Sequence, residues 1–584
     1  MGNSRKTDPT SGQAQTAPAR AELAAQWRAT VESMWSRVAD GTPPEGRAFL
    51  QRAVDQGGAL FALAGAGDDG PDGDVLWSQP LQLWQEAAAG VLAAALPDAG
   101  DPRSEALRTY QNALLAYTDT IRGVGARTLA DVVEAWPSRR ACGGARTGLR
   151  ELFDLYVELG ERHYHELVSA PAFAEISGRL INALVACVAP RQGEVSSGSG
   201  EGGAHASRAG FSADAIPDVS ALLAGLDLGI EQTLAELQAF GEKLDVGVAT
   251  LGRVGAIDVG TSEKQAVHRD GKMTLYRYAP IADVTNPVPV LIVYALANRP
   301  YMMDLQPQRS LVRGLMERGL EVYLIDWGYP DDDDRQLDLE RYVGGFIDDC
   351  VQVLCRRHGL DSVNLLGVCQ GGTFGLCYSA LNPQKVRNLV LMVTPVDFHT
   401  PENLLTAWLR HVDVDNLVDT LGNIPGALLN WAFISMKPLR LTSQKYLDML
   451  DSLGDEEKAR TFLRMEKWIH DSPDQAGECF RQFVKDLYQQ NKLIKGELQI
   501  GDRTIDLQRI TMPVLNLYAS HDHIVPPSAS LALEDLIATS DYTAWKFEGG
   551  HIGIYVSARA QQQVPQKIAE WLRARCPSGA QTSP

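Results

Sequence analysis

The sequence predicts a chain with two kinds of structure: an all-α first part, and an α/β second part built on a mostly parallel, doubly wound sheet. Apolar residues recur at three- and four-residue spacing through most of the first 190 residues, as they do in amphipathic helices. A Gly/Ser-rich stretch without periodicity follows at 191–210. Beyond it, short and nearly continuous apolar runs alternate with helical stretches, which is typical of strands buried on both faces.

The composition indicates a globular protein and excludes some classes of partner. The chain has 584 residues, of which 45% are hydrophobic, and a formal net charge of -19. This length favours two or three domains. The negative charge argues against nucleic acid as a partner, because phosphate backbones need a basic surface, but a local basic cluster would suffice for CoA. Eight scattered cysteines without a CxxC pair predict neither a disulfide framework nor a metal site, and no cofactor is expected.

The first part of the chain is predicted to be helical between two segments without regular structure. Residues 1–20 are polar and rich in Ala, Pro, Ser and Thr, so we expect them to be disordered. The helical domain is expected over 21–190 and a flexible linker over 191–215. The N-terminal residues lack the apolar region of a signal peptide, and no apolar run reaches the ~18 residues that a membrane span needs. We therefore expect a soluble, cytoplasmic protein without a transmembrane segment.

The catalytic domain is expected over 216–576, with a disordered tail at 577–584. It opens with one more amphipathic helical stretch, at 217–244, before the strands begin. More than a hundred residues of helical character, about 400–509, interrupt the strands and predict a helical cap inserted late in the sheet. The predicted strands lie at 272–280, 288–298, 320–328, 363–370, 386–396 and 512–520, and a seventh opens the segment "YTAWKFEGGHIGIY".

The turn after the fourth of these strands has the layout of a nucleophile elbow. In "GVCQGG", Gly367 and Gly371 stand two residues before and after Cys369, and Gly372 follows. Glycines at these positions let the strand and the next helix approach closely, but a cysteine stands where a serine is usual. Two interpretations are open at this point. Either Cys369 is the nucleophile of an acyl-transfer enzyme, or the turn holds an inert, buried thiol.

Two later segments favour the nucleophile. In an α/β-hydrolase fold the acid and then the histidine follow the nucleophile along the chain, each in a loop after a strand. Asp522 and His551 occur in that order, in "PVLNLYASHDHIVPP" and "YTAWKFEGGHIGIY". His551 would accept the proton of Cys369, and a thiolate exchanges readily with a CoA thioester. The oxyanion hole would consist of backbone N–H groups of Gln370 and of the loop around Ala297.

The segments that carry these residues resemble a known family. Residues 250–575, which include "LIVYALANRPYMMDLQPQRSLV", "NLLGVCQGGTFGLCYSAL" and "GGHIGIYVS", resemble the catalytic subunit of class III polyhydroxyalkanoate (PHA) synthases. In the helical part, "LYVELGERHYHELVSAPAFAEISGRLINALV" is similar to the accessory, E-type subunit of the same class. The chain therefore resembles the two subunits fused through the linker.

The resemblance implies an acyltransferase that passes (R)-3-hydroxyacyl groups, with 3-hydroxybutyryl expected, from CoA to Cys369 and on to a growing polyester chain. It implies that His551 activates the cysteine, that Asp522 helps to activate the 3-hydroxyl group, and that His523 lies near the CoA entrance. It also implies association with PHA granules in the cytoplasm and assembly into a dimer or larger homo-oligomer.

Two other functions stay open. A cysteine-nucleophile thioesterase, or a hydrolase similar to dienelactone hydrolase, would use the same residues but admit water to the acyl-enzyme. A non-catalytic granule scaffold is disfavoured, because the Cys, Asp and His residues are all present. For the helical part alone we expect a non-enzymatic role in binding, stabilising or activating the catalytic part.

Overall fold

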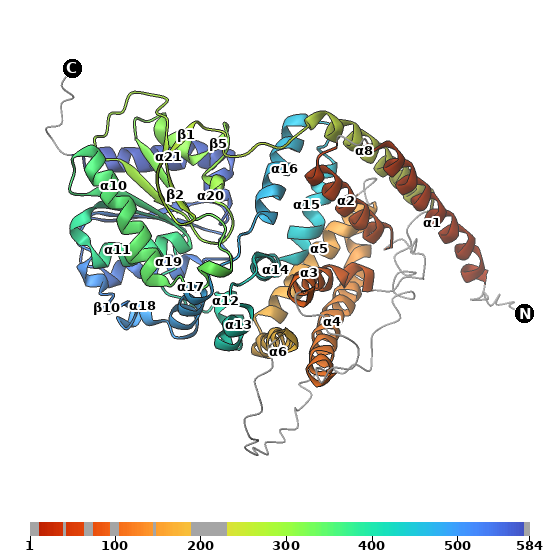
Figure 1. Cartoon of the computed structure of the whole chain (residues 1–584). Coiled ribbons are helices and arrows are strands. Elements are labelled where there is room, and N and C mark those ends of the chain that lie inside the picture. The colour runs from red at the N-terminus through yellow and green to blue at the C-terminus, as the bar shows by residue number, and fades with distance from the viewer. Residues whose placement is uncertain are drawn as a thin grey trace, which may run out of the picture.

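The computed structural model describes residues 11–38, 42–62, 74–93, 104–143, 148–188 and 230–576. The predicted linker at 191–215 and the predicted tail at 577–584 lie outside these residues. Figure 1 shows the helical N-terminal part at one end of the molecule and a helix-covered sheet at the other. The helices inserted between the late strands lie between these two parts, so the insertion is in contact with both.

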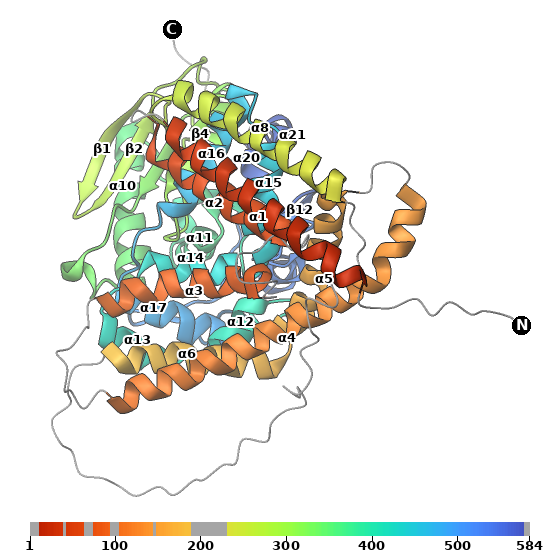
Figure 2. The same ribbon diagram turned by 90° about the vertical axis from the view of Figure 1, so that its right-hand side faces the viewer.

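Long helices make up the described part of the N-terminal region. α1 (Ser11–Arg37) begins inside the segment 1–20 for which disorder was predicted; residues 1–10 lie outside the description. α8 (Ile230–Val254) follows the linker in sequence, yet it packs along α1 and against α2, as Figure 2 shows for α1. The other helices are α2 (Pro44–Ala62), α3 (Asp74–Ala93), α4 (Ser104–Gly143), α5 (Leu149–Val168) and α6 (Pro171–Val188).

An eight-stranded sheet forms the centre of the second part, in the order β1-β2-β6-β3-β7-β8-β11-β12. β1 and β2 are antiparallel to their neighbours, and the other six strands run parallel. This topology confirms the predicted α/β-hydrolase fold class. Only β1 was not expected from the sequence, because its residues are largely polar and half exposed. The strands are β1 (Lys264–Asp270), β2 (Met273–Tyr278), β3 (Val290–Val293), β6 (Val322–Asp326), β7 (Val363–Val368), β8 (Val386–Met392), β11 (Val514–Ala519) and β12 (Tyr542–Phe547).

Both faces of the sheet are buried, which explains the unbroken apolar runs. In β3, Leu291 and Val293 belong to one hydrophobic cluster and Val290 and Ile292 to the other. The first cluster includes α10 (Asp348–His358) and α11 (Gln370–Leu381), and the second includes α9 (Leu311–Met316) and α21 (Ala558–Arg573). Strands with this pattern have no polar face, so alternation is absent from their sequence.

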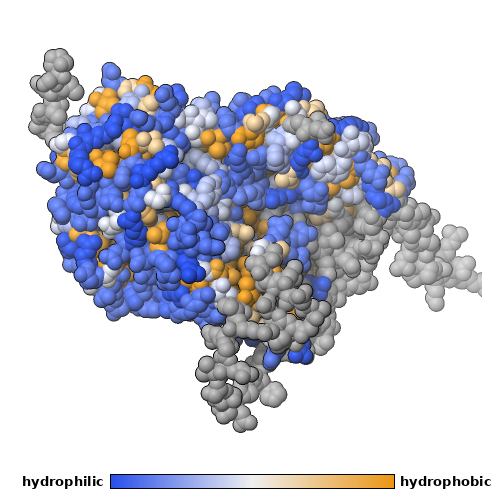
Figure 3. Space-filling view, viewed as in Figure 1, coloured by the Kyte–Doolittle hydropathy of each residue, from blue (hydrophilic) through white to orange (hydrophobic). Residues whose placement is uncertain are grey.

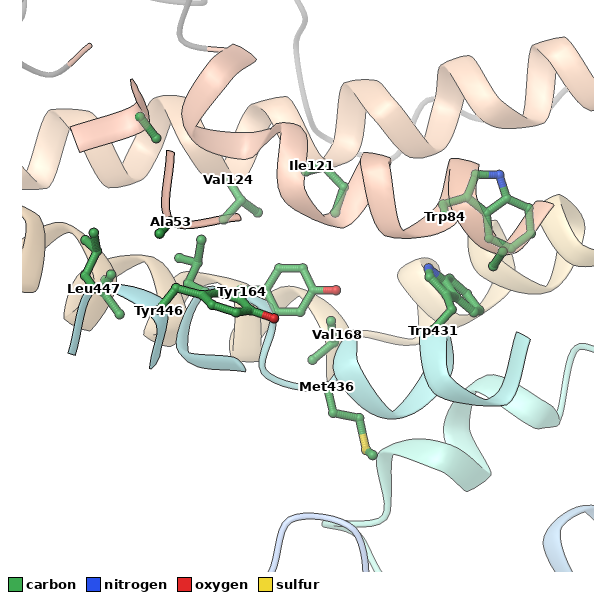
Figure 4. Packing of buried hydrophobic residues seen from close by; sticks show 14 of the residues in the cluster. Ala53, Trp84, Ile121, Val124, Tyr164, Val168, Trp431, Met436, Tyr446 and Leu447 are labelled. Carbon is green, nitrogen blue, oxygen red and sulfur yellow. The ribbon is translucent and has the colours of Figure 1, made fainter. Parts of the chain in front are cut away.

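The helices between β8 and β11, which we call the cap, share one hydrophobic core with the N-terminal helices. Trp84 of α3 packs edge-on against Trp431 of α14 with ring centroids 4.8 Å apart, and Phe49 of α2 against Phe462 of α16 at 5.3 Å. Figure 4 shows this core from close by, with side chains of both parts facing one another. The cap elements are α12 (Leu404–Leu409), α13 (Val414–Leu421), α14 (Gly426–Ile434), the π-helical η7 (Leu439–Gln444), α15 (Lys445–Leu450), α16 (Glu456–His470), α17 (Gly477–Gln482), the π-helical η8 (Phe483–Gln489) and α18 (Lys492–Lys495).

One described helix, α6, is long and apolar enough to cross a membrane by length and composition alone. Glu175 and Arg179 interrupt its apolar residues, so no unbroken run marks it in the sequence. Half of the helix is buried, and it packs against α4, α5, α12 and α13. This is the environment of a core helix.

The exposed surface carries few large apolar side chains among the described residues. Figure 3 shows a face that is largely hydrophilic, with apolar residues in separate groups. The large exposed apolar residues come from several elements, and single residues of this kind are normal on protein surfaces. They are Leu107, Leu115, Val246, Ile281 and Tyr329.

Candidate active site

Cys369 stands at the sharp turn between β7 and α11. Its backbone has φ 53° and ψ −125°, a conformation that costs a residue other than glycine about 1–3 kcal/mol. In this fold such a turn presents the nucleophile above the carboxyl edge of the sheet. Cys369 is half-buried, whereas Cys350 and Cys377 in the surrounding core are buried. Of these three thiols, only that of Cys369 is partly exposed.

The glycines of the elbow are required by close backbone contacts. A Cβ atom on Gly367 would lie 2.5 Å from Cα of Gly372, and one on Gly371 would lie 2.3 Å from the carbonyl oxygen of Val293. A Cβ atom on Gly372 would lie 1.9 Å from Oγ1 of Thr394. Non-bonded heavy atoms prefer separations of about 3.5 Å or more. The predicted elbow glycines are thus explained by packing of the turn against β3 and the end of β8.

His551 and Asp522 reach the same edge of the sheet from two neighbouring parallel strands, β12 and β11. Nδ1 of His551 lies 2.7 Å from Oδ2 of Asp522. The other oxygen, Oδ1, accepts hydrogen bonds from the backbone N–H groups of Ile524 at 2.9 Å and Val525 at 2.8 Å. The side chain of Asp522 is 0% exposed. Both of its oxygens are engaged, and one of them holds the imidazole in place.

Charges on two sides of His551 favour its protonated form. Burial alone would lower the pKa of His551, but the Asp522 carboxylate and the Cys369 thiolate raise it to about 10. The structure thus brings the three predicted residues together in the order carboxylate, imidazole, thiol. Such an arrangement allows the imidazole to take up the proton of the thiol.

Three tyrosines lie close enough to Cys369 for its charge to change their pKa values. Burial raises the pKa of Tyr294, Tyr488 and Tyr555, and negative charge on Cys369 raises each further. All three are therefore neutral at physiological pH and keep an O–H group that can donate a hydrogen bond. Tyr294 follows β3, Tyr488 belongs to η8 of the cap and Tyr555 to α20 (Gly553–Val556), so the cysteine is enclosed from three elements. None of the three could be singled out from the sequence, because buried tyrosines carry no motif.

A hydrogen bond joins the two segments predicted to form the oxyanion hole, which are the start of α11 and the loop after β3. Gln370 is the first residue of α11, so its backbone N–H has no partner within the helix. Its side-chain Oε1 accepts a hydrogen bond from the N–H of Leu296 at 3.0 Å. Ala297 is the next residue and is half-buried. The side chain of Gln370 therefore anchors the loop after β3 to the elbow.

The same loop is held on its other side by the end of α16. Asn298, with φ 57°, donates from Nδ2 to the carbonyl oxygens of Trp468 and Ile469, each at 3.3 Å. Nε1 of Trp468 donates to the carbonyl oxygen of Arg299 at 2.9 Å. Sequence reasoning missed these residues, since about 170 positions separate the partners.

His523 lies beside Asp522 and is half-buried. Burial and the positive charge of Lys437 lower the pKa of His523 to about 4, so the imidazole is neutral at physiological pH. Lys437 stands in the turn between α14 and η7, which brings a cation of the cap to this side of the site. Among the described residues, no group of three or more His, Cys, Asp and Glu side chains is placed to hold a metal ion.

Comparison with known proteins shows the family to which the chain belongs. Residues 288–558 match the alpha/beta hydrolase fold, residues 222–315 the N-terminus of poly-beta-hydroxybutyrate polymerase (PhaC), and residues 103–201 the poly(R)-hydroxyalkanoic acid synthase subunit of the class III E type. The chain is 56% identical over 355 residues to the poly(3-hydroxyalkanoate) polymerase subunit PhaC of Allochromatium vinosum, covering 60% of this chain and 99% of that one. The chain belongs to the class III polyhydroxyalkanoate synthases. The predicted family is therefore confirmed, and the protein is a poly(3-hydroxyalkanoate) polymerase, an acyltransferase that uses hydroxyacyl-CoA.

Further comparisons extend this result. The PhaC subunit of a Synechocystis strain is 54% identical over 357 residues, covering 60% of this chain and 94% of that one. Because E-type and PhaC segments match in one chain, this synthase is a fusion of the two. Solved structures similar to it include a monoacylglycerol lipase from Paleococcus ferrophilus (18% identity, TM-score 0.33, covering 49% of this chain and 96% of that one) and an esterase from Thermogutta terrifontis (19% identity, TM-score 0.33, covering 54% and 100%).

Proposed function

We propose that this synthase builds its polyester through an acyl-thioester on Cys369. The observation that carries the proposal is the thiol at a nucleophile elbow beside a buried His551 whose Nδ1 lies 2.7 Å from Asp522. The thiolate attacks the carbonyl carbon of the hydroxyacyl-CoA thioester, and the N–H groups of Gln370 and Ala297 stabilise the oxyanion. The tetrahedral intermediate then collapses, and the CoA sulfur leaves with the proton held by His551.

Chain growth uses His551 a second time, as a base. The terminal 3-hydroxyl group of the growing chain loses its proton to Nε2 of His551, and its oxygen attacks the acyl carbon on Cys369. A C–O ester bond forms, the C–S bond breaks, and Cys369 leaves as the thiolate that starts the next cycle. The resemblance assigned the hydroxyl activation to Asp522. Its side chain is 0% exposed and both oxygens are engaged, which supports an indirect role through His551.

The substrate proposed is (R)-3-hydroxybutyryl-CoA. The match of residues 222–315 to the poly-beta-hydroxybutyrate polymerase N-terminus supports a short acyl group. The neutral His523 and the cation of Lys437 lie on one side of the catalytic residues, where the phosphates of CoA would find a positive charge. These two residues are the proposed contacts for the leaving group.

The helical part is proposed to act without chemistry of its own. Its helices α2, α3, α5 and α6 pack on the cap, which supports a role in holding the cap over the site. Assembly into a homo-oligomer and attachment to the granule surface belong to this proposal as well, because PHA synthases work at the surface of their own insoluble product.

The experiment that tests the proposal is CoA release from (R)-3-hydroxybutyryl-CoA by the purified chain and by the Cys369→Ala variant, with the insoluble product analysed. CoA release with polymer recovered, both lost in the variant, supports the synthase mechanism. CoA release that yields only free 3-hydroxybutyrate would indicate a thioesterase instead. Mass spectrometry of the quenched protein should find the acyl group on the peptide that contains Cys369.

A further inference from the structure

A buried cluster of charges joins the helical part to the cap. Glu466 of α16 is 5% exposed. Its carboxylate accepts hydrogen bonds from Nζ of Lys445 at 2.8 Å, from the hydroxyl of Tyr446, and from the guanidinium of Arg52 at 3.2 Å. Arg52 comes from α2 of the helical part, and the other three residues belong to the cap. α2 lies against α15 and α16 over this cluster (Figure 1).

The same guanidinium reaches the end of α16 that holds the oxyanion loop. Nη1 of Arg52 lies 2.6 Å from Nε2 of His470, the last residue of α16. The preceding residues, Trp468 and Ile469, offer the carbonyl oxygens that accept from Asn298. Asn298 is adjacent to Ala297. A continuous set of hydrogen bonds and packed backbone therefore leads from α2 to the loop after β3.

We infer that Arg52 is a positioning residue for the catalytic site: it fixes the end of α16 and, through Asn298, the backbone N–H donor of the oxyanion loop. The inference rests on the proposed function, in which that loop stabilises the oxyanion. An oxyanion donor works only if it is held at about 2.7–3.1 Å from the developing charge. Misplacement of a catalytic group by about 1 Å can cost about 100-fold in rate. A side chain of the helical part thereby contributes to the chemical step.

The variant Arg52→Ala is expected to fold. Glu466 keeps Lys445 and Tyr446 as partners, so no buried charge loses all of its hydrogen bonds. Removal of Glu466 would be a poor test, because it would leave Lys445 buried without its carboxylate. Arg52→Lys is the conservative variant. Its ammonium group keeps the positive charge and can donate to Glu466, but it does not reach the position of Nη1, the nitrogen of Arg52 that contacts both Glu466 and His470. Partial rescue is therefore expected.

Arg150 of α5 provides a matched control at the same interface. Its guanidinium pairs with Asp448 and with Asp451 at 3.1 Å, and all three side chains are about a third or more exposed. These partners lie on and just after α15, away from the end of α16 that contacts Asn298. Arg150→Ala therefore removes a cationic contact between the helical part and the cap without touching the path to the loop.

The test compares two reactions of Cys369 in the wild type and the three variants. One is acylation by (R)-3-hydroxybutyryl-CoA, measured as the rate of the first turnover and as kcat and KM. The other is alkylation by iodoacetamide, followed by mass spectrometry of the Cys369 peptide. Both require the thiolate, but only acylation passes through an oxyanion. For Arg52→Ala we expect acylation about 10- to 100-fold slower with KM and alkylation unchanged, and for Arg150→Ala no change in either reaction.

Several outcomes would overturn the inference. Acylation at the wild-type rate in Arg52→Ala would do so, as would an equal loss in Arg150→Ala, which would indicate a general effect of the interface. A parallel loss of alkylation would place the effect on the Cys369–His551 pair instead of the loop. If Arg52→Ala does not fold, as judged by near-UV circular dichroism, the same comparison is made with Arg52→Lys. A wild type that is alkylated but never acylated would overturn the proposed function, and this inference with it.

Discussion

Replacing Asp522 by Asn should separate acylation of Cys369 from growth of the polymer. Oδ1 of Asp522 receives the N–H groups of Ile524 and Val525, so an amide at this position must keep its oxygen there. The reverse orientation would leave two buried donors facing an NH₂ group, at about 1–3 kcal/mol each. The amide nitrogen then faces His551 and donates to Nδ1, and His551 must carry its own proton on Nε2, towards Cys369.

The size of the effect follows from the pKa of His551. Asp522 and Cys369 raise this pKa to about 10. A return of the pKa to the ordinary value of about 6.5 would remove about 5 kcal/mol of stabilisation of the imidazolium. Asp522 supplies a large share of that stabilisation. A thiol is acidic enough to ionise in water without help from a base. A hydroxyl group is a far weaker acid and does not. We therefore expect acylation to fall at pH 7 and to recover as the pH rises, while chain growth falls by about 10²–10⁴ at every pH.

The assay is rapid quench, with CoA from the first turnover measured by chromatography and polymer measured over later turnovers, between pH 7 and 9. Asp541→Asn is the matched control, since Asp541 pairs with Arg575 near the surface and away from the site. Chain growth at the wild-type rate in Asp522→Asn would refute the reasoning. An equal loss of acylation and chain growth at every pH would refute it too, because one base would then limit both steps alike.

Three further predictions concern strain, pH and the shared core. Cys369→Gly and Cys369→Ala should both be inactive, but the glycine variant should have a free energy of unfolding about 1 kcal/mol higher, because the positive φ of this position suits glycine; equal melting temperatures in calorimetry would contradict this. His523 has a pKa of about 4 in the folded protein and of about 6.5 when unfolded, so stability should be lost as the pH falls from about 6.5 towards 4. His523→Asn should remove on the order of 2 kcal/mol of that loss. Denaturant unfolding of both proteins at pH 7 and pH 4.5 measures it, and the same difference in free energy of unfolding between the two pH values in wild type and variant would contradict the prediction. Expressed as separate chains, residues 1–200 and 216–584 should elute together in size-exclusion chromatography, and 216–584 alone should bind a hydrophobic dye; independent elution without dye binding would argue against the shared core.

The candidate catalytic residues could be predicted to lie together because their signals are local. A glycine-flanked turn, a loop acid and a loop histidine follow particular strands, and parallel strands bring their carboxyl ends to one edge. Cys369, Asp522 and His551 could therefore be placed together from chain order alone. The fold class followed from apolar runs such as that of β3, whose length and continuity require burial on both faces.

The packing partners of the amphipathic helices could not be predicted. Periodicity indicates which face of a helix is buried, but it does not indicate which other element covers that face. Arg52 and Glu466 lie 414 positions apart, and nothing near either residue points to the other. The helix that became α8 was assigned to the catalytic domain by its place after the linker, yet it packs on α1, α2 and α16. The pairing of Arg52 with Glu466 and the packing of α8 have the same cause: one hydrophobic core is built from segments that are far apart in the sequence.

That shared core constrains how the cap can move. Trp408 and Trp431 of the cap are 4% exposed, and Trp84 of α3, which packs on Trp431, is 0% exposed. A cap that swung away from the helical part would expose these aromatic side chains, each of which buries about 150–250 Å², at about 25 cal/mol per Å². Exposure of the three would thus cost on the order of 10 kcal/mol. Opening of the site for the polymer is therefore expected to involve smaller segments, such as the loop and π-helix that carry Tyr488, or a joint movement of the cap with the N-terminal helices. A cysteine pair engineered across α2 and α16 would test this expectation, because it would block a separation of cap and helical part but neither of these two movements; loss of activity on oxidation of the pair would contradict it.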